Sequence, residues 1–353
     1  MTTSPLRVRI VLSPDNASWI LEKMANRLAD GATARNVTAY VAAVPDPSAD
    51  LNHWMSYAFA NERHDTPTSM TITHLDDPYK IGMVARLLKK SVDLGICLSS
   101  DHARYLAEQG VPADRLAYVV PGHDFVASPR PIVIGITTRL YKDGRKREAM
   151  LIELARAVDL SAFRFDIFGA GWERVIDRLE AAGARIRYFP GTTDFVADYQ
   201  AIAEALPHFD YYLYLGRDEG SLGTLDALAA GVKTIVTPQG FHCDLPGGIT
   251  HPVWTQEELN QVFHQLAEER RSLAAAVAPF SWDAYAEAHC RLWSDIVHGR
   301  PIEQPAPTHN HAVVPRRESR RDVALRHFSP FRIRSALSHI PILKPVKRWL
   351  RRR

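Results

Sequence analysis

Strand-like runs alternate with amphipathic helical segments along most of the chain, and this alternation restricts the possible folds more than any other feature. The β-branched run Arg7–Ser13 predicts a buried strand, and the apolar residues from Ile20 to Leu28 recur at helical spacing. Strands that alternate with helices form mostly parallel sheets with right-handed crossovers. Further strands are predicted at 37–44, 71–74, 94–98 and 116–120, and a helix at 102–109.

The same pattern restarts after Ser128-Pro129, so the chain contains two α/β units. Strands are predicted at 132–136, 163–168, 186–189, 211–215 and 234–236, and helices at 147–157 and 175–182. A length of 353 residues is comfortable for two hydrophobic cores. We therefore expect an N-terminal domain over 1–128 and a C-terminal domain over 129–298, closed by a helix at 282–297.

The end of the sequence differs from the body in composition. Residues 299–315 contain four prolines and predict a linker. From Pro315 to Arg353 there are 13 Lys and Arg against two acidic residues, a balance of +11, so the rest of the chain carries −8. Short apolar faces beside the basic residues of 316–353 predict binding to an anionic membrane surface, whereas nucleic acid and a solvated tail are the alternatives.

The N-terminal residues and the cysteines bear on location. The first residues lack the apolar stretch of a signal peptide, and no apolar segment is long enough to span a bilayer. The three cysteines are far apart and contain no CxxC pair, which fits a reducing compartment. We expect a cytoplasmic protein that is peripheral on the inner membrane surface.

The densest chemical signal is the segment from Leu215 to Gly231, which predicts a strand end, an acidic turn with glycine, and a helix. Backbone N–H groups at Ser221–Thr224 would point outward from the helix N-terminus, where they favour a phosphate group. The carboxylate of Glu219 lies beside that point and can accept hydrogen bonds from sugar hydroxyls. Asp226 falls one turn later, within reach of a ribose.

At these residues the chain resembles the retaining glycosyltransferases of the GT-B fold, close to family 4. Glu219-Gly220 and the helix Asp226–Gly231 match the two parts of the donor motif of that family. The family has seven residues between its two acidic positions, whereas Glu219 and Asp226 are separated by six. Asp218 restores the spacing of seven, so Asp218 and Glu219 both stay candidates, and Glu219 is preferred because glycine follows it.

The resemblance covers about residues 6–298 and implies two Rossmann-like domains facing a central cleft. It assigns the donor diphosphate to Arg139 and to either Lys142 or Lys146, and it places His74 toward the acceptor. It also implies retention of the anomeric configuration. Because Arg139, Lys142 and Lys146 supply positive charge and no acidic cluster resembles a metal–diphosphate site, we expect no metal ion and no cofactor beyond the nucleotide-sugar donor. The residues assigned to catalysis are Glu219, Arg139, Lys146 and His74. The residues assigned to donor binding are Lys142, Gly169, Gly171, Gly220, Ser221, Leu222, Gly223, Thr224 and Asp226.

These residues also have purely structural explanations. Gly169 and Gly171 are typical of a tight strand–helix turn, Arg139 of a surface ion pair, Asp226 of a helix position that faces solvent, and His74 of a hydrogen-bonded core histidine. A nicotinamide-dependent oxidoreductase is disfavoured because the first turn, Pro14–Ala17, contains no glycine. A sugar-nucleotide epimerase and a non-catalytic nucleotide-sugar-binding protein remain alternatives. The donor base and sugar, the acceptor, whether a glycan or a lipid-linked one, and the oligomeric state stay open.

Overall fold

The computed structural model describes residues 4–16, 19–60, 65–74, 78–124 and 129–303, and these residues form two parallel sheets. The N-terminal sheet has the strand order β2-β1-β3-β4-β5-β6. Its strands are β1 (Leu6–Val11), β2 (Val37–Ala42), β3 (Leu51–Trp54), β4 (Thr68–Ile72), β5 (Leu94–Cys97) and β6 (Leu116–Tyr118). The helices between them are α1 (Ile20–Thr33), α2 (Pro78–Lys90) and α3 (Ser100–Glu108). The Ser99 hydroxyl caps α3 by accepting a hydrogen bond from the His102 N–H, at 3.2 Å.

The C-terminal sheet has the strand order β12-β11-β10-β7-β8-β9, and all its pairs are parallel as well. Its strands are β7 (Ile132–Thr137), β8 (Phe163–Phe168), β9 (Arg185–Phe189), β10 (Tyr211–Tyr214), β11 (Lys233–Val236) and β12 (His251–Pro252). The helices after β7 are α4 (Ala149–Ala157), α5 (Glu173–Ala181), α6 (Phe195–Ala205), α7 (Leu222–Ala229), α8 (Gln256–Val277) and α9 (Trp282–Val297). The prediction of two α/β domains built on parallel sheets is confirmed.

Each sheet is covered on both faces, as parallel sheets require. In the C-terminal sheet, one face packs against α4, α5 and α8, and the other contributes Tyr212 and Tyr214 to a smaller core with α7. Neighbouring residues of one strand alternate between faces. In β1, for example, Ile10 belongs to one core of the N-terminal sheet and Val11 to the other.

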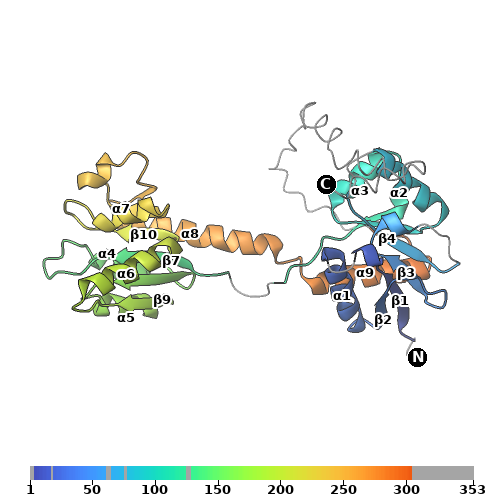
Figure 1. Ribbon diagram of the computed structural model, residues 1–353, viewed down its shortest axis with the longest axis horizontal. Helices are drawn as coiled ribbons and strands as arrows, with labels where there is room; N and C mark the ends of the chain where they lie inside the picture. Colours follow the sequence, from blue (N-terminus) through green and yellow to red (C-terminus); the bar gives the residue numbers. More distant parts are fainter. Residues whose placement is uncertain (1–3, 17–18, 61–64, 75–77, 125–128, 304–353) are drawn as a thin grey trace, which may run out of the picture. The chain divides into compact units, whose positions relative to one another are not determined.

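The last helix, α9, differs from expectation because it belongs to the N-terminal core. Its fully buried Tyr285 and Trp293 pack with residues of β1, β3 and α1, and Figure 1 shows α9 beside α1. The prediction that residues 282–297 close the C-terminal domain is therefore wrong. An amphipathic pattern shows that a helix has an apolar face, but it does not show which sheet covers that face.

Part of the N-terminal core is polar. His53 of β3 is fully buried, with its ring between the Ser69 hydroxyl at 2.9 Å and the Thr71 hydroxyl at 3.1 Å. The centroid of its ring lies 5.4 Å from the ring centroids of His289 and Trp293 on α9. Burial lowers the pKa of His289 to about 4, so the histidine is neutral at pH 7.

Some expectations concern residues that the structure does not describe. The tail at 316–353, most of the predicted linker and the predicted domain boundary at 128 lie outside the described residues. Within the described ranges, no helix is long and apolar enough to cross a membrane.

Candidate functional site

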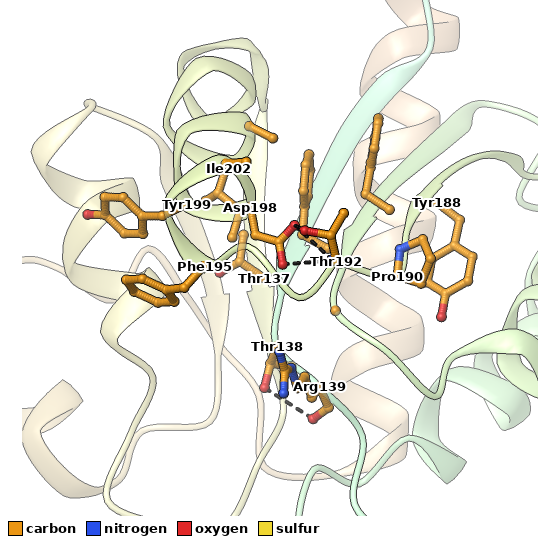
Figure 2. Close-up of a pocket in the computed structure, with 16 residues that line it drawn as sticks. Thr137, Thr138, Arg139, Tyr188, Pro190, Thr192, Phe195, Asp198, Tyr199 and Ile202 are labelled. Carbon is orange, nitrogen blue, oxygen red and sulfur yellow. Dashed lines mark hydrogen bonds between the residues drawn. The ribbon is translucent and has the colours of Figure 1, made fainter.

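A slot of about 520 Å³ lies at the carboxyl ends of β7, β8 and β9 in the C-terminal domain. Five of the residues that line it are aromatic, and two of their rings, Phe168 and Phe189, stack with centroids 4.6 Å apart. Figure 2 shows Phe195 and Tyr199 of α6 on one side of the slot and Tyr188 on the other. A slot of this size with flat apolar walls fits a planar aromatic group.

The loop that precedes α6 is fixed by two aspartates. The Asp194 carboxylate caps α6 by accepting hydrogen bonds from the Val196 and Ala197 N–H groups. One turn later, the Asp198 carboxylate accepts from the Thr192 N–H at 2.8 and 2.9 Å. The loop therefore forms a preorganised wall of the slot.

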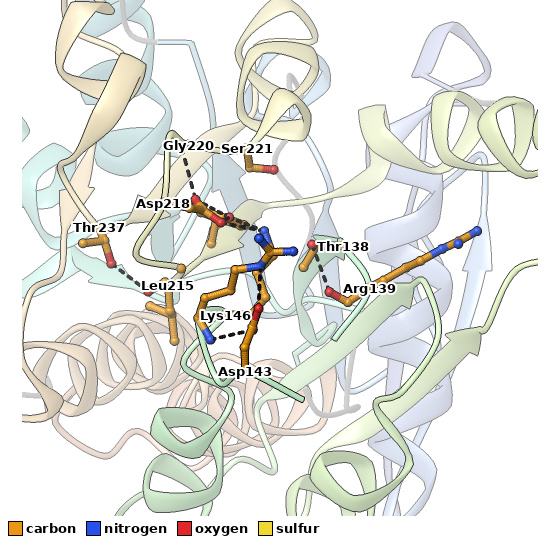
Figure 3. A network of polar contacts seen from close by, with 12 residues as sticks. Thr138, Arg139, Asp143, Lys146, Leu215, Asp218, Gly220, Ser221 and Thr237 are labelled. Carbon is orange, nitrogen blue, oxygen red and sulfur yellow. Dashed lines mark hydrogen bonds and ion pairs between the residues drawn. The ribbon is translucent and has the colours of Figure 1, made fainter. Parts of the chain in front are cut away.

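Arg139 lies at the edge of this slot. Its side chain is exposed and has no hydrogen bond or ion pair to another described residue. In Figure 3 the side chain extends away from Lys146 and Asp218, so the structure does not bring the two predicted diphosphate ligands into contact. A free guanidinium on a loop can turn toward an anion without breaking an existing bond.

The glycines of the turn after β8 have a structural explanation. Gly169 has φ +121°, and a Cβ at that position would lie 2.6 Å from the Thr138 carbonyl oxygen. Gly171 has φ +95° and packs beside Leu140. The turn needs glycine for its backbone conformation and for the close passage of the Thr138–Leu140 segment.

Lys146 and Asp218 form a largely buried polar cluster at this edge of the sheet. Lys146 Nζ lies 2.7 Å from Asp218 Oδ2 and 2.6 Å from the Tyr214 hydroxyl. The Tyr214 hydroxyl donates to Asp218, at 2.6 Å from Oδ1 and 2.5 Å from Oδ2. The Gly220 N–H completes the cluster by donating a hydrogen bond to Asp218 Oδ1 at 3.1 Å, as Figure 3 shows. Gly220 itself has φ +114°.

In these contacts both oxygens of the Asp218 carboxylate accept hydrogen bonds from other groups of the protein. Burial alone would raise its pKa, but the Lys146 ammonium, the Tyr214 hydroxyl and the Gly220 N–H together lower it below the ordinary value. Glu219, the next residue, has an exposed side chain with no hydrogen bond or ion pair to another described residue. Its backbone carbonyl is held by the Phe241 N–H at 3.1 Å. The turn therefore presents one carboxylate that is engaged and one that is free.

Lys142 lies elsewhere. It is exposed and lines a separate cavity of about 470 Å³ with Arg174 and Glu148. Of the two lysines that the sequence left open, the structure brings Lys146 to the acidic turn and does not bring Lys142 there.

The N-terminus of α7 directs two backbone N–H groups outward. The Ser221 N–H is already used, since it donates to His242 Nε2 at 3.0 Å, and the Thr224 N–H donates to the Ser221 carbonyl at 2.9 Å. The N–H groups of Leu222 and Gly223 have no acceptor among the described residues. A Cβ on Gly223 would lie 2.2 Å from Thr137 Oγ1, so only glycine brings the helix this close to β7. Two free donors at a helix N-terminus favour an anion.

His242 supports this helix end and was not predicted from the sequence. The ring is fully buried, with Nδ1 3.1 Å from the Thr237 carbonyl and Nε2 facing the Ser221 N–H. A nitrogen beside a carbonyl must donate, and one beside an N–H must accept, so the ring is neutral with its proton on Nδ1. No motif marked this residue, because its role depends on contacts between distant segments.

The remaining candidates lie apart from this cluster. Asp226 is half-buried on α7, one turn after Leu222. His74 follows β4 in the N-terminal domain, is exposed and has φ +53°, so the interpretation as a core histidine is wrong. Among the described residues, no three or more His, Cys, Asp or Glu side chains are grouped so that they could hold a metal ion.

Comparison with solved structures finds similar glycosyltransferases. HepE from Anabaena, in complex with UDP and glucose, is 12% identical, with 83% of this chain and 96% of HepE covered and a TM-score of 0.30. The lipopolysaccharide outer core galactosyltransferase WaaB is 12% identical, with 83% and 99% covered and a TM-score of 0.34. A glycosyltransferase from Rickettsia africae is also 12% identical, with 84% and 99% covered and a TM-score of 0.34. No protein-family model and no curated protein matches the sequence.

Proposed function

We propose that this protein is a glycosyltransferase of the GT-B class that transfers a sugar from a nucleotide-sugar donor. The observation that carries the proposal is one edge of the C-terminal sheet, where three features lie at neighbouring strand ends. These are the aromatic slot, the outward N–H groups of α7, and the Lys146–Asp218 cluster beside the free Glu219. They fit, respectively, a nucleobase, a diphosphate and a sugar.

The diphosphate is the leaving group, and negative charge grows on it as the glycosidic bond breaks. Lys146, the Leu222 and Gly223 N–H groups, and Arg139 after a side-chain rotation would stabilise that charge. Only stabilisation that increases in the transition state raises the rate, and preorganised donors meet that requirement. We propose that transfer needs no divalent metal because these groups supply the positive charge.

Glu219 is the proposed sugar-binding carboxylate. Its side chain is exposed at the turn, whereas both oxygens of Asp218 already accept hydrogen bonds. Asp226 is proposed for the ribose and His74 for the acceptor side. Retention of configuration, a glycan or lipid-linked acceptor, and a place in envelope polysaccharide or glycolipid synthesis complete the proposal.

Thermal shifts with nucleoside diphosphates and nucleotide sugars test donor binding. We expect one nucleotide of a panel of UDP, GDP and ADP, in EDTA, to stabilise the protein by about 2.7 kcal/mol at 100 times its dissociation constant. Arg139→Ala should weaken binding about 10-fold, because a charge-assisted hydrogen bond to phosphate is lost.

The matched control is Arg178→Ala, which removes an exposed arginine of α5 that does not line the slot. It should bind as the unchanged protein does. Absence of any shift with every nucleotide and sugar nucleotide would contradict the proposal, and a shift that requires Mg²⁺ would contradict the metal-free part. Conversion of the sugar nucleotide to an epimeric sugar nucleotide without an acceptor would identify an epimerase instead.

A second proposal concerns location: residues 316–353 hold the cytoplasmic enzyme on an anionic membrane surface. The segment carries a balance of +11 from Pro315 onward, and each basic residue near such a surface contributes about 1 kcal/mol. We expect the full chain to sediment with vesicles containing phosphatidylglycerol at low salt and to be released by high salt.

A shortened protein that ends at Val314 is the control, and it should stay in solution under all these conditions. Equal sedimentation of both proteins would show that the tail is not the anchor. Binding of the full chain to neutral vesicles, unchanged by salt, would rule out the electrostatic explanation. A preference for a DNA or RNA duplex over anionic vesicles would assign the tail to nucleic acid.

A further inference from the structure

Tyr214, the last residue of β10, bridges the two charged groups of the acidic turn. Its hydroxyl accepts a hydrogen bond from Lys146 Nζ at 2.6 Å and donates to the Asp218 carboxylate at 2.6 and 2.5 Å. The Lys146 ammonium also lies 4.8 Å from the centre of the Tyr214 ring, within the range of a cation–π interaction. The hydroxyl of this one side chain therefore contacts both the lysine and the carboxylate.

Both charged groups are largely withdrawn from water. The side chains of Lys146 and Asp218 are 12% and 8% exposed, and Tyr214 is buried. A buried charge needs its partners in good geometry, since solvent cannot replace them. A phenol that accepts from the ammonium and donates to the carboxylate satisfies both groups at once.

Tyr214 is also the fixed member of the three. It belongs to a strand between β7 and β11, whereas Lys146 lies in the segment between β7 and α4, outside any helix or strand. A lysine has a flexible four-carbon stem and gains little orientation from its own backbone. The sheet can therefore set the position of the ammonium only through contacts such as those with Tyr214 and Asp218.

We infer that Tyr214 is a positioning residue for the donor site, which orients the Lys146 ammonium toward the donor diphosphate by joining it to Asp218. The inference rests on the proposed function, and it deepens it by adding a residue outside the recognised donor motif. It also gives Asp218 a role distinct from that of Glu219: Asp218 orients the cation, and Glu219 contacts the sugar.

The surroundings of the cluster define its pH response. The charged groups that face Tyr214 are Lys146, from the loop after β7, and Asp218 and Glu219, from the turn. The uncharged groups are Tyr212, from the same strand, and the neutral His242, whose ring centre is 5.7 Å from that of Tyr214. The Tyr214 hydroxyl is one of the groups that lower the pKa of Asp218. Its removal should therefore raise the pKa of Asp218 and leave fewer contacts on Lys146.

The test compares Tyr214→Phe with the unchanged protein and with Tyr211→Phe. Tyr211 lies on the same strand, its hydroxyl has no hydrogen bond to another described residue, and it does not belong to the cluster. Affinity for the nucleoside diphosphate that binds best is measured by calorimetry on the full chain, across pH and below the lowest melting temperature. Tyr214→Phe should bind about 10-fold more weakly, the change expected for one hydrogen bond to a charged group. The pH at which the affinity changes as Asp218 titrates should move upward, and Tyr211→Phe should alter neither quantity.

A double-mutant comparison separates positioning from a general packing effect. In an Asp218→Asn background, Tyr214→Phe should cost much less affinity than in the unchanged protein, because the two residues act through one network. Additive losses, or an unchanged affinity and pH dependence in Tyr214→Phe, would overturn the inference while nucleotide binding by the unchanged protein still stands. If the unchanged protein binds no nucleoside diphosphate, the proposed function fails, and the inference fails with it.

Discussion

Glu219→Gln should lower turnover about 100-fold or more while leaving the free energy of unfolding almost unchanged. The carboxylate is proposed to contact the sugar in the transition state, and loss of one such contact has an effect of this size. Stability should be preserved because the side chain is exposed, whereas the structural contact of this residue is made by its backbone carbonyl. The measurement is turnover of the nucleotide sugar with acceptor, together with urea denaturation.

Asp218→Asn provides the comparison. It leaves the Lys146 ammonium largely buried with a neutral partner, so it should lower both stability and nucleotide affinity. A nearly silent Glu219→Gln combined with a strongly impaired but stable Asp218→Asn would show that Asp218 binds the sugar. That result would also select the seven-residue spacing of the resembled family as the correct alignment.

Trp293→Ala should destabilise the N-terminal domain by about 3–5 kcal/mol, the usual cost of removing a buried tryptophan. Trp293 is fully buried on α9 and packs against the rings of His53 and His289, with centroids 5.4 and 5.7 Å away. Amide hydrogen exchange locates the effect. Exchange should increase in β1 and β3, which share the core with α9, and not in β7 or β8.

Trp293→Phe is the matched control. The indole N–H has no hydrogen-bond partner among the described residues, so phenylalanine removes an unsatisfied polar group while retaining most of the apolar volume. It should cost far less stability than alanine. Faster exchange in the C-terminal sheet instead would contradict the assignment of α9 to the N-terminal core.

The sequence predicted those elements whose pattern is local. The strand at 163–168 was predicted with the bounds that the structure shows, because apolar side chains occupy alternating positions from Phe163 to Ile167. The strand β3 was missed, since Asn52 and His53 interrupt the apolar run although both are fully buried. The burial of His53 depends on hydroxyl partners from the neighbouring strand, and that of Asn52 on hydrogen bonds with the Asp46 backbone, and periodicity reveals neither.

The same contrast between local patterns and contacts made by folding applies to the candidate site. The acidic turn and the helix after it were predicted from adjacent residues, and the structure places a helix from Leu222 to Ala229. The partners of this turn come from other segments: Tyr214 from the preceding strand and His242 from the loop after β11. Neither carries a recognisable pattern of its own, because each matters only through what folding places beside it. The roles assigned to Glu219, Arg139, Lys146, Asp226 and His74 stay predictions.

The position of α9 has a consequence for synthesis on the ribosome. Domains generally fold in the order in which they leave the exit tunnel, N-terminal first. Here, however, the first domain takes its last core helix from residues 282–297, which are translated after every strand of the second domain. Until then the nascent first domain exposes the apolar surface that Tyr285 and Trp293 will cover. The domain made first is therefore the one completed last, and its newly made, unfinished form is the natural client for chaperones that bind apolar surface.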